Sequence, residues 1–144
     1  KDTSAFHRPV YKNRLSSRGS GVTWDNDKII GSRNDWIIQE SLDILEELRV
    51  YVIHGTIFQT GAIRQSMLEG LKLRIIESRK LSKDEIKFAQ EAGKQAPNLD
   101  FLGLDIARTS DGKLQLMEAN RSPGFAAFAD KTGINLAHLL YDQV

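Results

Sequence analysis

Two carboxylates and an amide fall close together on a predicted β-hairpin over residues 100–120. A Ser-Asp-Gly turn separates two apolar strands, with Asp105 on the first and Glu118 and Asn120 on the second. Side chains two positions apart share a face, and the turn places Asp105 roughly opposite Glu118, with Cβ atoms about 5.5 Å apart. Oxygen donors without His or Cys favour Mg²⁺ or Mn²⁺ over zinc. The spacing therefore predicts a divalent-cation site.

A second interpretation of these three residues needs no metal. Both carboxylates would then flank the hairpin in water, and Asn120 would begin the turn after the strand. Two carboxylates that lie close together without a cation repel each other, so one of them would keep its proton to a higher pH.

The segment "KNRLSSRGSGV", residues 12–22, is a candidate phosphate-binding loop. Backbone amides of a glycine-rich loop can surround phosphate oxygens because no Cβ blocks their approach, and Lys12 would add a positive charge. The segment lacks the Gly-Lys-Ser/Thr of a P-loop, and a plain surface turn is the alternative. Together with an oxygen-only metal site, the loop and the basic residues after it suit a nucleotide polyphosphate. Those basic residues are Arg49, Arg64, Lys72, Arg74, Arg79 and Lys80.

Composition narrows the class of protein. The 144 residues are 40% hydrophobic and 27% charged, as in an ordinary globular domain, and the net charge of +1 gives no bulk attraction to nucleic acid or membrane. The absence of cysteine excludes disulfides and thiolate metal sites and fits a reducing compartment such as the cytoplasm. No apolar run is long enough to cross a bilayer. The chain begins with Lys1, so we expect it to be part of a longer protein.

Hydrophobic patterns and turn signals predict the elements that carry these residues. Predicted strands and hairpins cover residues 8–15, 36–42, 48–63 and 100–120, and predicted helices cover residues 82–97 and 134–144. The second strand pair should bend at His54-Gly55. The first helix should begin at Ser82, with Glu85 three residues on completing a capping box. Antiparallel hairpins with about two main helices predict an α+β fold.

The lysine, the glycine loop and the two hairpins occur in an order that resembles the ATP-grasp fold, most closely its RimK-like branch of ligases. The resemblance runs from Lys12 to Leu140, and "GLDI…LMEANRSPGF" is its most specific part. It implies two α+β lobes whose antiparallel sheets hold ATP between them. Residues 1–81 would be part of the first lobe and residues 82–144 the C-terminal lobe, with the N-terminal domain of such ligases absent from this chain.

The resemblance also implies roles for individual residues. Lys12 and Arg64 match the family's phosphate-binding residues and are the implied catalytic pair. "IIQESL", residues 37–42, resembles the strand that binds adenine, and Glu47 resembles the acidic residue that binds ribose. The implied nucleotide-binding set is Lys12, Arg18, Gly19, Ser20, Gly21, Gln39, Glu40, Ser41, Leu42, Glu47 and Arg64. The implied metal ligands are Asp105, Glu118 and Asn120.

The implied activity is an ATP-dependent, ADP-forming carbon–nitrogen ligase. A substrate carboxylate would attack the γ-phosphoryl group, and an amine would displace phosphate from the resulting acyl phosphate. The implied cofactors are ATP and Mg²⁺ or Mn²⁺, and the implied substrates are a small-molecule or peptide carboxylate and an amine. The resemblance further suggests a cytoplasmic enzyme and allows a homo-oligomer.

Three other functions stay open at this stage. The Arg-Ser-Asn run that follows the phosphate arginine in the RimK-like branch is missing from residues 67–81. A module that binds Mg-ATP without catalysis is therefore one alternative. A kinase that phosphorylates a hydroxyl group is the second, and a structural α+β domain is the third.

Overall fold

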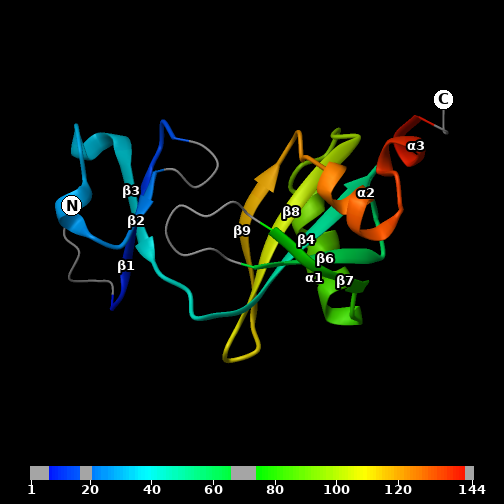
Figure 1. Cartoon of the computed structure of the whole chain (residues 1–144), viewed down its shortest axis with the longest axis horizontal. Coiled ribbons are helices and arrows are strands. Elements are labelled where there is room, and N and C mark those ends of the chain that lie inside the picture. Colours follow the sequence, from blue (N-terminus) through cyan, green and yellow to red (C-terminus); the bar gives the residue numbers. More distant parts are fainter. Residues whose placement is uncertain (1–6, 17–20, 66–73, 142–144) are drawn as a thin grey trace. The chain divides into compact units, whose positions relative to one another are not determined.

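A computed structural model describes residues 7–16, 21–65 and 74–141 of the chain. These residues form two compact units, the first ending at Asp43 and the second beginning at Ile44. Each unit is built on its own antiparallel sheet (Figure 1).

The first unit contains a three-stranded sheet in the order β2-β1-β3. Its strands are β1 (Pro9–Asn13), β2 (Val22–Thr23) and β3 (Trp36–Glu40). Two short 3₁₀ turns, η1 (Asn26–Lys28) and η2 (Arg33–Asp35), precede β3. Strand β1 pairs with both neighbours, so the two strands predicted over residues 8–15 and 36–42 are confirmed and lie side by side.

The second unit contains a six-stranded sheet with β7-β6-β4-β8-β9 as its path and β5 paired to β4. The strands are β4 (Ile44–Ile53), β5 (Thr56–Ile57), β6 (Thr60–Gln65), β7 (Arg74–Lys80), β8 (Phe101–Thr109) and β9 (Leu114–Asn120). All of its pairings are antiparallel. The bends fall where the sequence predicts them, because His54, Gly55 and Gly112 have positive φ angles of 47°, 74° and 83°.

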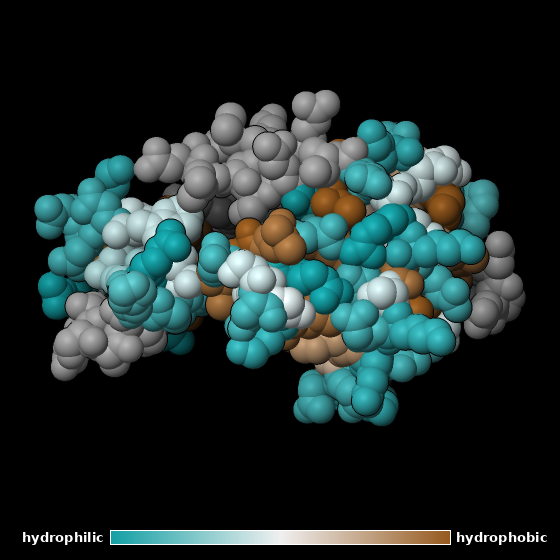
Figure 2. Space-filling model, turned by 90° about the horizontal axis from the view of Figure 1, so that it is seen from below, coloured by the Kyte–Doolittle hydropathy of each residue, from teal (hydrophilic) through white to brown (hydrophobic). Residues whose placement is uncertain are grey.

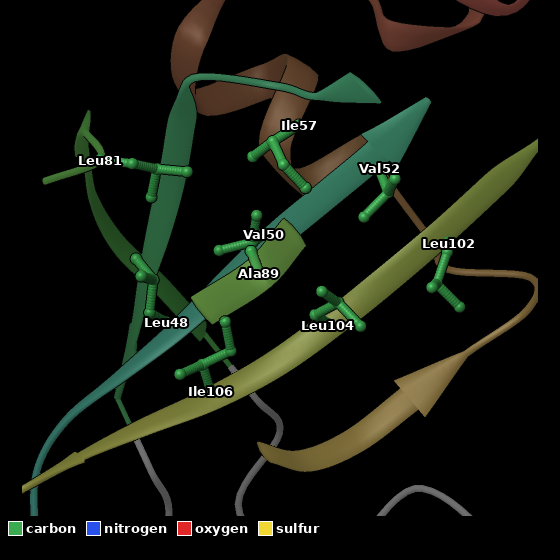
Figure 3. Close-up of a cluster of buried hydrophobic side chains, with 9 residues drawn as sticks. All are labelled: Leu48, Val50, Val52, Ile57, Leu81, Ala89, Leu102, Leu104 and Ile106. Carbon is green, nitrogen blue, oxygen red and sulfur yellow. The ribbon is translucent and has the colours of Figure 1, made fainter. Parts of the chain in front are cut away.

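One face of this sheet carries the larger core, which helix α1 (Lys83–Lys94) covers. Figure 3 shows the buried side chains of β4 and β8 gathered around Ala89 of the helix. The predicted helix start is confirmed: the Ser82 hydroxyl accepts from the backbone N–H of Glu85, and the Glu85 carboxylate accepts from the backbone N–H of Ser82. The cluster consists of Leu48, Val50, Val52, Ile57, Leu81, Ala89, Leu102, Leu104 and Ile106.

Glu85 also joins the helix to three strands. Its carboxylate accepts hydrogen bonds from Arg79 on β7 at 2.8 Å and from Arg108 on β8 at 2.9 Å, and Arg79 reaches Glu46 on β4. Burial alone would raise the pKa of Glu85, but the hydrogen bonds from Arg79, Arg108 and Ser82 hold it well below its usual range. The group therefore stabilises the fold above its unfolded-state pKa, and that stabilisation is lost as pH falls through the folded pKa.

We therefore expect Glu85→Gln to lower the free energy of unfolding by roughly 2–4 kcal/mol at pH 7, since it leaves two arginines short of a charged partner. Below about pH 5 the difference from the wild-type chain should shrink, because the wild-type carboxylate begins to lose its advantage. Urea unfolding at several pH values measures both effects. Glu91→Gln is the matched control, because Glu91 lies on the same helix with an exposed Lys94 partner and should cost under about 0.5 kcal/mol. A Glu85→Gln variant as stable as this control would contradict the assignment.

The other face of the sheet is partly covered by α2 (Ala126–Thr132) and α3 (Leu136–Tyr141). An aromatic cluster fills the space: Tyr51 stacks on Phe101 at 5.7 Å between ring centroids and meets Phe128 edge-on at 5.2 Å. The expectation of about two main helices is wrong in detail, since α2 is additional and α3 is shorter than the predicted 134–144 segment. Strand β7 is likewise a structural finding, because its basic sequence gave no strand prediction.

The predicted lobe boundary after residue 81 describes the ATP-grasp lobes, whereas the boundary at residues 43/44 describes the chain's own compact units. Strands β4 to β7 share one sheet with β8 and β9, and the lobe assignment stays a prediction. In the described part of the chain, no helix has the length and apolar character needed to cross a membrane. On the face shown in Figure 2, hydrophilic residues surround small separate groups of hydrophobic ones.

Candidate active site

Charged side chains from neighbouring strands share one face of the larger sheet. In the register of the sheet, Glu47 lies opposite Arg64, and Arg49 lies opposite Asp105. Directly paired residues of antiparallel strands project to the same face, and so do residues two positions apart on one strand. This face also carries Tyr51, so the charged group continues directly into the aromatic cluster.

Asp105 is held between two arginines. Its Oδ2 accepts a hydrogen bond from Nη2 of Arg49 at 2.9 Å, while Oδ1 makes ion-pair contacts with Nε of Arg49 and Nη1 of Arg64. Only 5% of the Asp105 surface is exposed, so these are largely desolvated charges. Removing one partner from such a group is costly because the remaining charge stays buried.

Three buried polar atoms in this cluster have capacity for a further partner. Nε of Arg49, Nη1 of Arg64 and Oδ1 of Asp105 contact one another as ions, yet within the described ranges none of them has a hydrogen-bond partner. Buried polar groups in folded proteins are nearly always hydrogen-bonded, so incompletely satisfied ones point to a ligand, water or ion. A carboxylate can accept about four bonds, which leaves Asp105 able to bind a cation as well.

Glu47 completes the charged row. Its Oε1 lies 3.2 Å from Nη1 of Arg64, and the residue is 6% exposed. Burial raises the pKa of Glu47, and Arg64 acts in the opposite direction, while the negative charge of Asp105 adds to the rise. The ribose role implied for Glu47 stays a prediction; in the structure its neighbour is the arginine implied to bind phosphates.

The three residues with which the sequence analysis began come together in the predicted register. Asp105 pairs directly with Glu118, and Asn120 pairs with Gly103 two residues before Asp105. A bulge follows the Asp105–Glu118 pair, which shifts the register towards the turn. Glu118 is exposed, whereas Oδ1 of Asn120 accepts a hydrogen bond from the backbone N–H of Ser122 at 2.9 Å.

These donors fit a hard divalent cation by type and by placement. They supply two carboxylates and an amide oxygen, the ligands that Mg²⁺ and Mn²⁺ favour. No group of three or more His, Cys, Asp or Glu side chains in the described segments is arranged around a metal position, so the amide of Asn120 is needed to complete the set. Metal binding at these residues stays a prediction that the register supports.

The implied nucleotide residues of the first unit lie on β1, β3 and their connections. Lys12 pairs with Ile37, and Val10 pairs with Gln39, so Lys12 and Gln39 share one face of the small sheet. Glu40 projects to the other face, where its carboxylate accepts from the backbone N–H groups of His7 at 3.0 Å and Arg8 at 2.8 Å. The carboxylate of Glu40 thus has structural partners of its own.

The remaining candidates in the first unit are near the glycine loop. Arg18, Gly19 and Ser20 lie outside the described residues. A Cβ at Gly21 would lie 2.5 Å from Cβ of Ser16, so the chain requires glycine at this close approach. Ser41 accepts a hydrogen bond from the Trp24 indole at 3.1 Å, and Leu42 is partly buried beyond the end of β3.

Two residues beside the site were missed as functional candidates from the sequence. Arg49 stood out as one of several basic residues, and nothing local marked it as the partner of Asp105. Gly103 carried no signal because its importance depends on Arg49 and Pro123, which approach it across the sheet. A charged residue within the otherwise apolar run "LRVYVI" was the only available clue.

The antiparallel architecture and the Asp-Glu-Asn register are those of the ATP-grasp class, and the fold comparison agrees. ATP-grasp ligase PsnB, solved with minimal precursor, Mg and ADP, superimposes with a TM-score of 0.69 at 21% identity, covering 94% of this chain and 45% of that one. A Chryseobacterium gregarium RiPP-associated ATP-grasp ligase, solved with ADP and a leader and core peptide, gives a TM-score of 0.58 at 16% identity, covering 94% of this chain and 49% of that one.

The chain belongs to the ATP-grasp domain family: the model of family 3 of one clade of these domains matches residues 14–123. Among curated proteins, a probable alpha-L-glutamate ligase 2 of Hahella chejuensis is 27% identical over 153 residues, covering 94% of this chain and 49% of the relative. A probable alpha-L-glutamate ligase of Shewanella loihica is 34% identical over 84 residues, covering 58% and 26%. The chain therefore spans about half the length of the first relative and about a quarter of the second.

Proposed function

We propose that this chain is the ATP-binding part of an ATP-dependent carboxylate–amine ligase that releases ADP and phosphate. The observation that carries the proposal is the pairing of Asp105 with Glu118 on the sheet face that also carries Arg64. Membership of the ATP-grasp family and the ligase names of the curated relatives support it.

Arg64 is the proposed phosphate-binding residue of the second unit. Its ion pairs with Glu47 and Asp105 both use Nη1, and a guanidinium offers five N–H donors in a fixed fork. Phosphate oxygens could therefore be bound without breaking both pairs. Lys12 and the loop around Gly21 would contribute further phosphate contacts from the first unit, and Gln39 would contribute to adenine binding.

Asp105, Glu118 and Asn120 are the proposed ligands of Mg²⁺ or Mn²⁺. When bound, the cation would neutralise charge that develops on the phosphoryl group during transfer. A solved neighbour containing Mg and ADP is consistent with this assignment. Arg49 would keep Asp105 in place, while the hydrogen bond from Ser122 N–H to Asn120 would fix the turn after β9.

The proposed reaction has two steps. An oxygen of the substrate carboxylate attacks the γ-phosphorus, and the bond to the β-phosphate oxygen breaks, giving an acyl phosphate and ADP. The nitrogen of an amine then attacks the acyl carbon and loses a proton as phosphate leaves, giving an amide. In this proposal the amine approaches beside Arg121, Ser122 and Gly124, and a hydrogen bond of 3.1 Å from the Tyr51 hydroxyl to the Gly124 carbonyl holds that turn.

The substrates are proposed as a class only: a small-molecule or peptide carboxylate together with an amine. Cytoplasmic location and homo-oligomer formation stay predictions from the resemblance. ADP release that depends on both a carboxylate and an amine, with an amide detected by mass spectrometry, would support a ligase. A stable phosphorylated product that needs no amine would instead indicate a kinase.

A nucleotide-binding module without catalysis is the second candidate. The specific observation in its favour is that the chain covers only 49% of its first curated relative. Nucleotide binding without release of ADP, under any combination of carboxylate and amine, would favour this candidate over the ligase.

A further inference from the structure

Arg49 occupies the middle of the charged row. It lies on the central strand β4, opposite Ala62 on β6 and opposite Asp105 on β8. Its Nε and Nη2 meet the two oxygens of the Asp105 carboxylate, Nη2 at 2.9 Å from Oδ2. A fork of this kind fixes the plane of a carboxylate, which a single ammonium group does not do.

The third guanidinium nitrogen of Arg49 lies against the backbone of β8. A Cβ at Gly103 would be 2.7 Å from Nη1 of Arg49 and 2.5 Å from Cβ of Pro123. Only glycine leaves room for both, so the arginine passes between strand β8 and the buried proline. Gly103 is also the residue paired with Asn120, the third proposed metal ligand.

The contacts of Arg49 therefore connect two of the proposed ligands. It grips Asp105 directly, it packs beside the position opposite Asn120, and it approaches the same glycine as Pro123 in the turn that follows. Its side chain is 11% exposed, so the arrangement is held by packing as well as by charge. Residues that hydrogen-bond a metal ligand typically change metal affinity by about 10–100-fold when they are replaced.

We infer that Arg49 is a positioning residue that sets the orientation of the Asp105 carboxylate and its spacing to Asn120 for a divalent cation. The inference rests on the proposed metal–nucleotide site and adds to it a residue that touches neither the metal nor the substrate. Arg49 is thus distinct from Arg64, which we propose contacts phosphate.

The test compares metal-dependent and metal-independent nucleotide affinity. Calorimetric titration with a non-hydrolysable ATP analogue, with and without Mn²⁺, gives the ratio of the two affinities for the wild-type chain, Arg49→Lys and Arg108→Lys. Arg108 is the matched control because it lies three residues after Asp105 on β8 and pairs with the buried Glu85. A purely structural loss would weaken binding with and without metal alike, whereas a positioning loss lowers the ratio.

We expect the ratio to fall by at least about 10-fold in Arg49→Lys and to stay within about twofold in Arg108→Lys. If Arg49→Lys does not fold, Gly103→Ala carries the same test, because it displaces the guanidinium and removes no charge. A ratio unchanged from wild type, or lowered equally in Arg108→Lys, overturns the inference while the proposed function stands. A wild-type chain whose nucleotide binding ignores Mn²⁺ overturns both.

Discussion

Replacing Glu118 with glutamine should lower the rate of ADP release by roughly 100- to 1,000-fold while the fold remains intact. The substitution keeps the size of the side chain and removes the one negative charge among the proposed ligands that is exposed to solvent. Charge stabilisation of a transferring phosphoryl group is worth about this much when a single contributing group is lost. Because Glu118 is exposed, we expect its own contribution to stability to be within about 0.5 kcal/mol.

The measurement is steady-state ADP release under saturating carboxylate and amine, with urea unfolding of the same preparations. Glu77→Gln is the matched control, since Glu77 is an exposed carboxylate on β7 at the opposite edge of the same sheet. Its turnover should equal that of the wild-type protein. Equal turnover in Glu118→Gln would remove Glu118 from the site.

Replacing Arg64 with alanine should have a large effect on stability as well as on turnover. Glu47 and Asp105 are 6% and 5% exposed, and both contact Nη1 of Arg64. Removing one member of such a buried ionic group costs about 3–5 kcal/mol because a charge is left without its partner. Turnover should fall with it, since the proposed phosphate contact is lost as well.

The pH dependence of this variant has a definite sign. Burial already raises the pKa of Glu47 and Arg64 opposes the rise, so the pKa should climb further in Arg64→Ala. A raised folded-state pKa means that the contribution of Glu47 is full below its unfolded pKa and declines as pH rises through the folded one. Arg64→Ala should therefore be more stable at pH 5 than at pH 8.

Urea unfolding of Arg64→Ala, Glu47→Gln and the double variant tests the same cluster. Removing the charge of Glu47 should return part of the lost stability, about 1–2 kcal/mol, because the pair is directly coupled. Strict additivity of the two single changes, or an Arg64→Ala variant as stable as the wild type, would contradict the ion-pair arrangement.

Local signals predicted the parts of the fold whose geometry depends on neighbours in sequence. The Ser-Asp-Gly turn and the alternation around it were enough to place Asp105 opposite Glu118. Ser82 and Glu85 likewise marked the start of α1, since a capping box needs only three residues of spacing.

The elements that were missed are stabilised mainly by distant contacts. Strand β7 forms because β6 pairs with it along its length, and nothing in the local pattern of basic residues predicts that pairing. Helix α2 has no side-chain hydrogen bond at its start and is held by Phe128, which is fully buried against Tyr51. Both cases show tertiary packing overriding weak local preference.

The identity of Asp105's partners lay beyond the sequence for the same reason. Arg49 and Asp105 are separated by 56 positions, and their contact depends on the register between β4 and β8. Six basic residues were candidates for phosphate contact, and the register distinguishes among them: Arg49 and Arg64 face the site, while Arg79 pairs with Glu46 and Glu85.

The central claim is that the hairpin of β8 and β9 binds a metal-bound nucleotide. The most direct measurement is calorimetric titration of a non-hydrolysable ATP analogue, with and without Mg²⁺, into the wild-type chain and into Glu118→Ala/Asn120→Ala. We predict magnesium-dependent binding by the wild-type chain that the double variant loses while its far-UV circular dichroism is unchanged. Equal magnesium dependence in both proteins, or no binding by the folded wild-type chain, would contradict the claim.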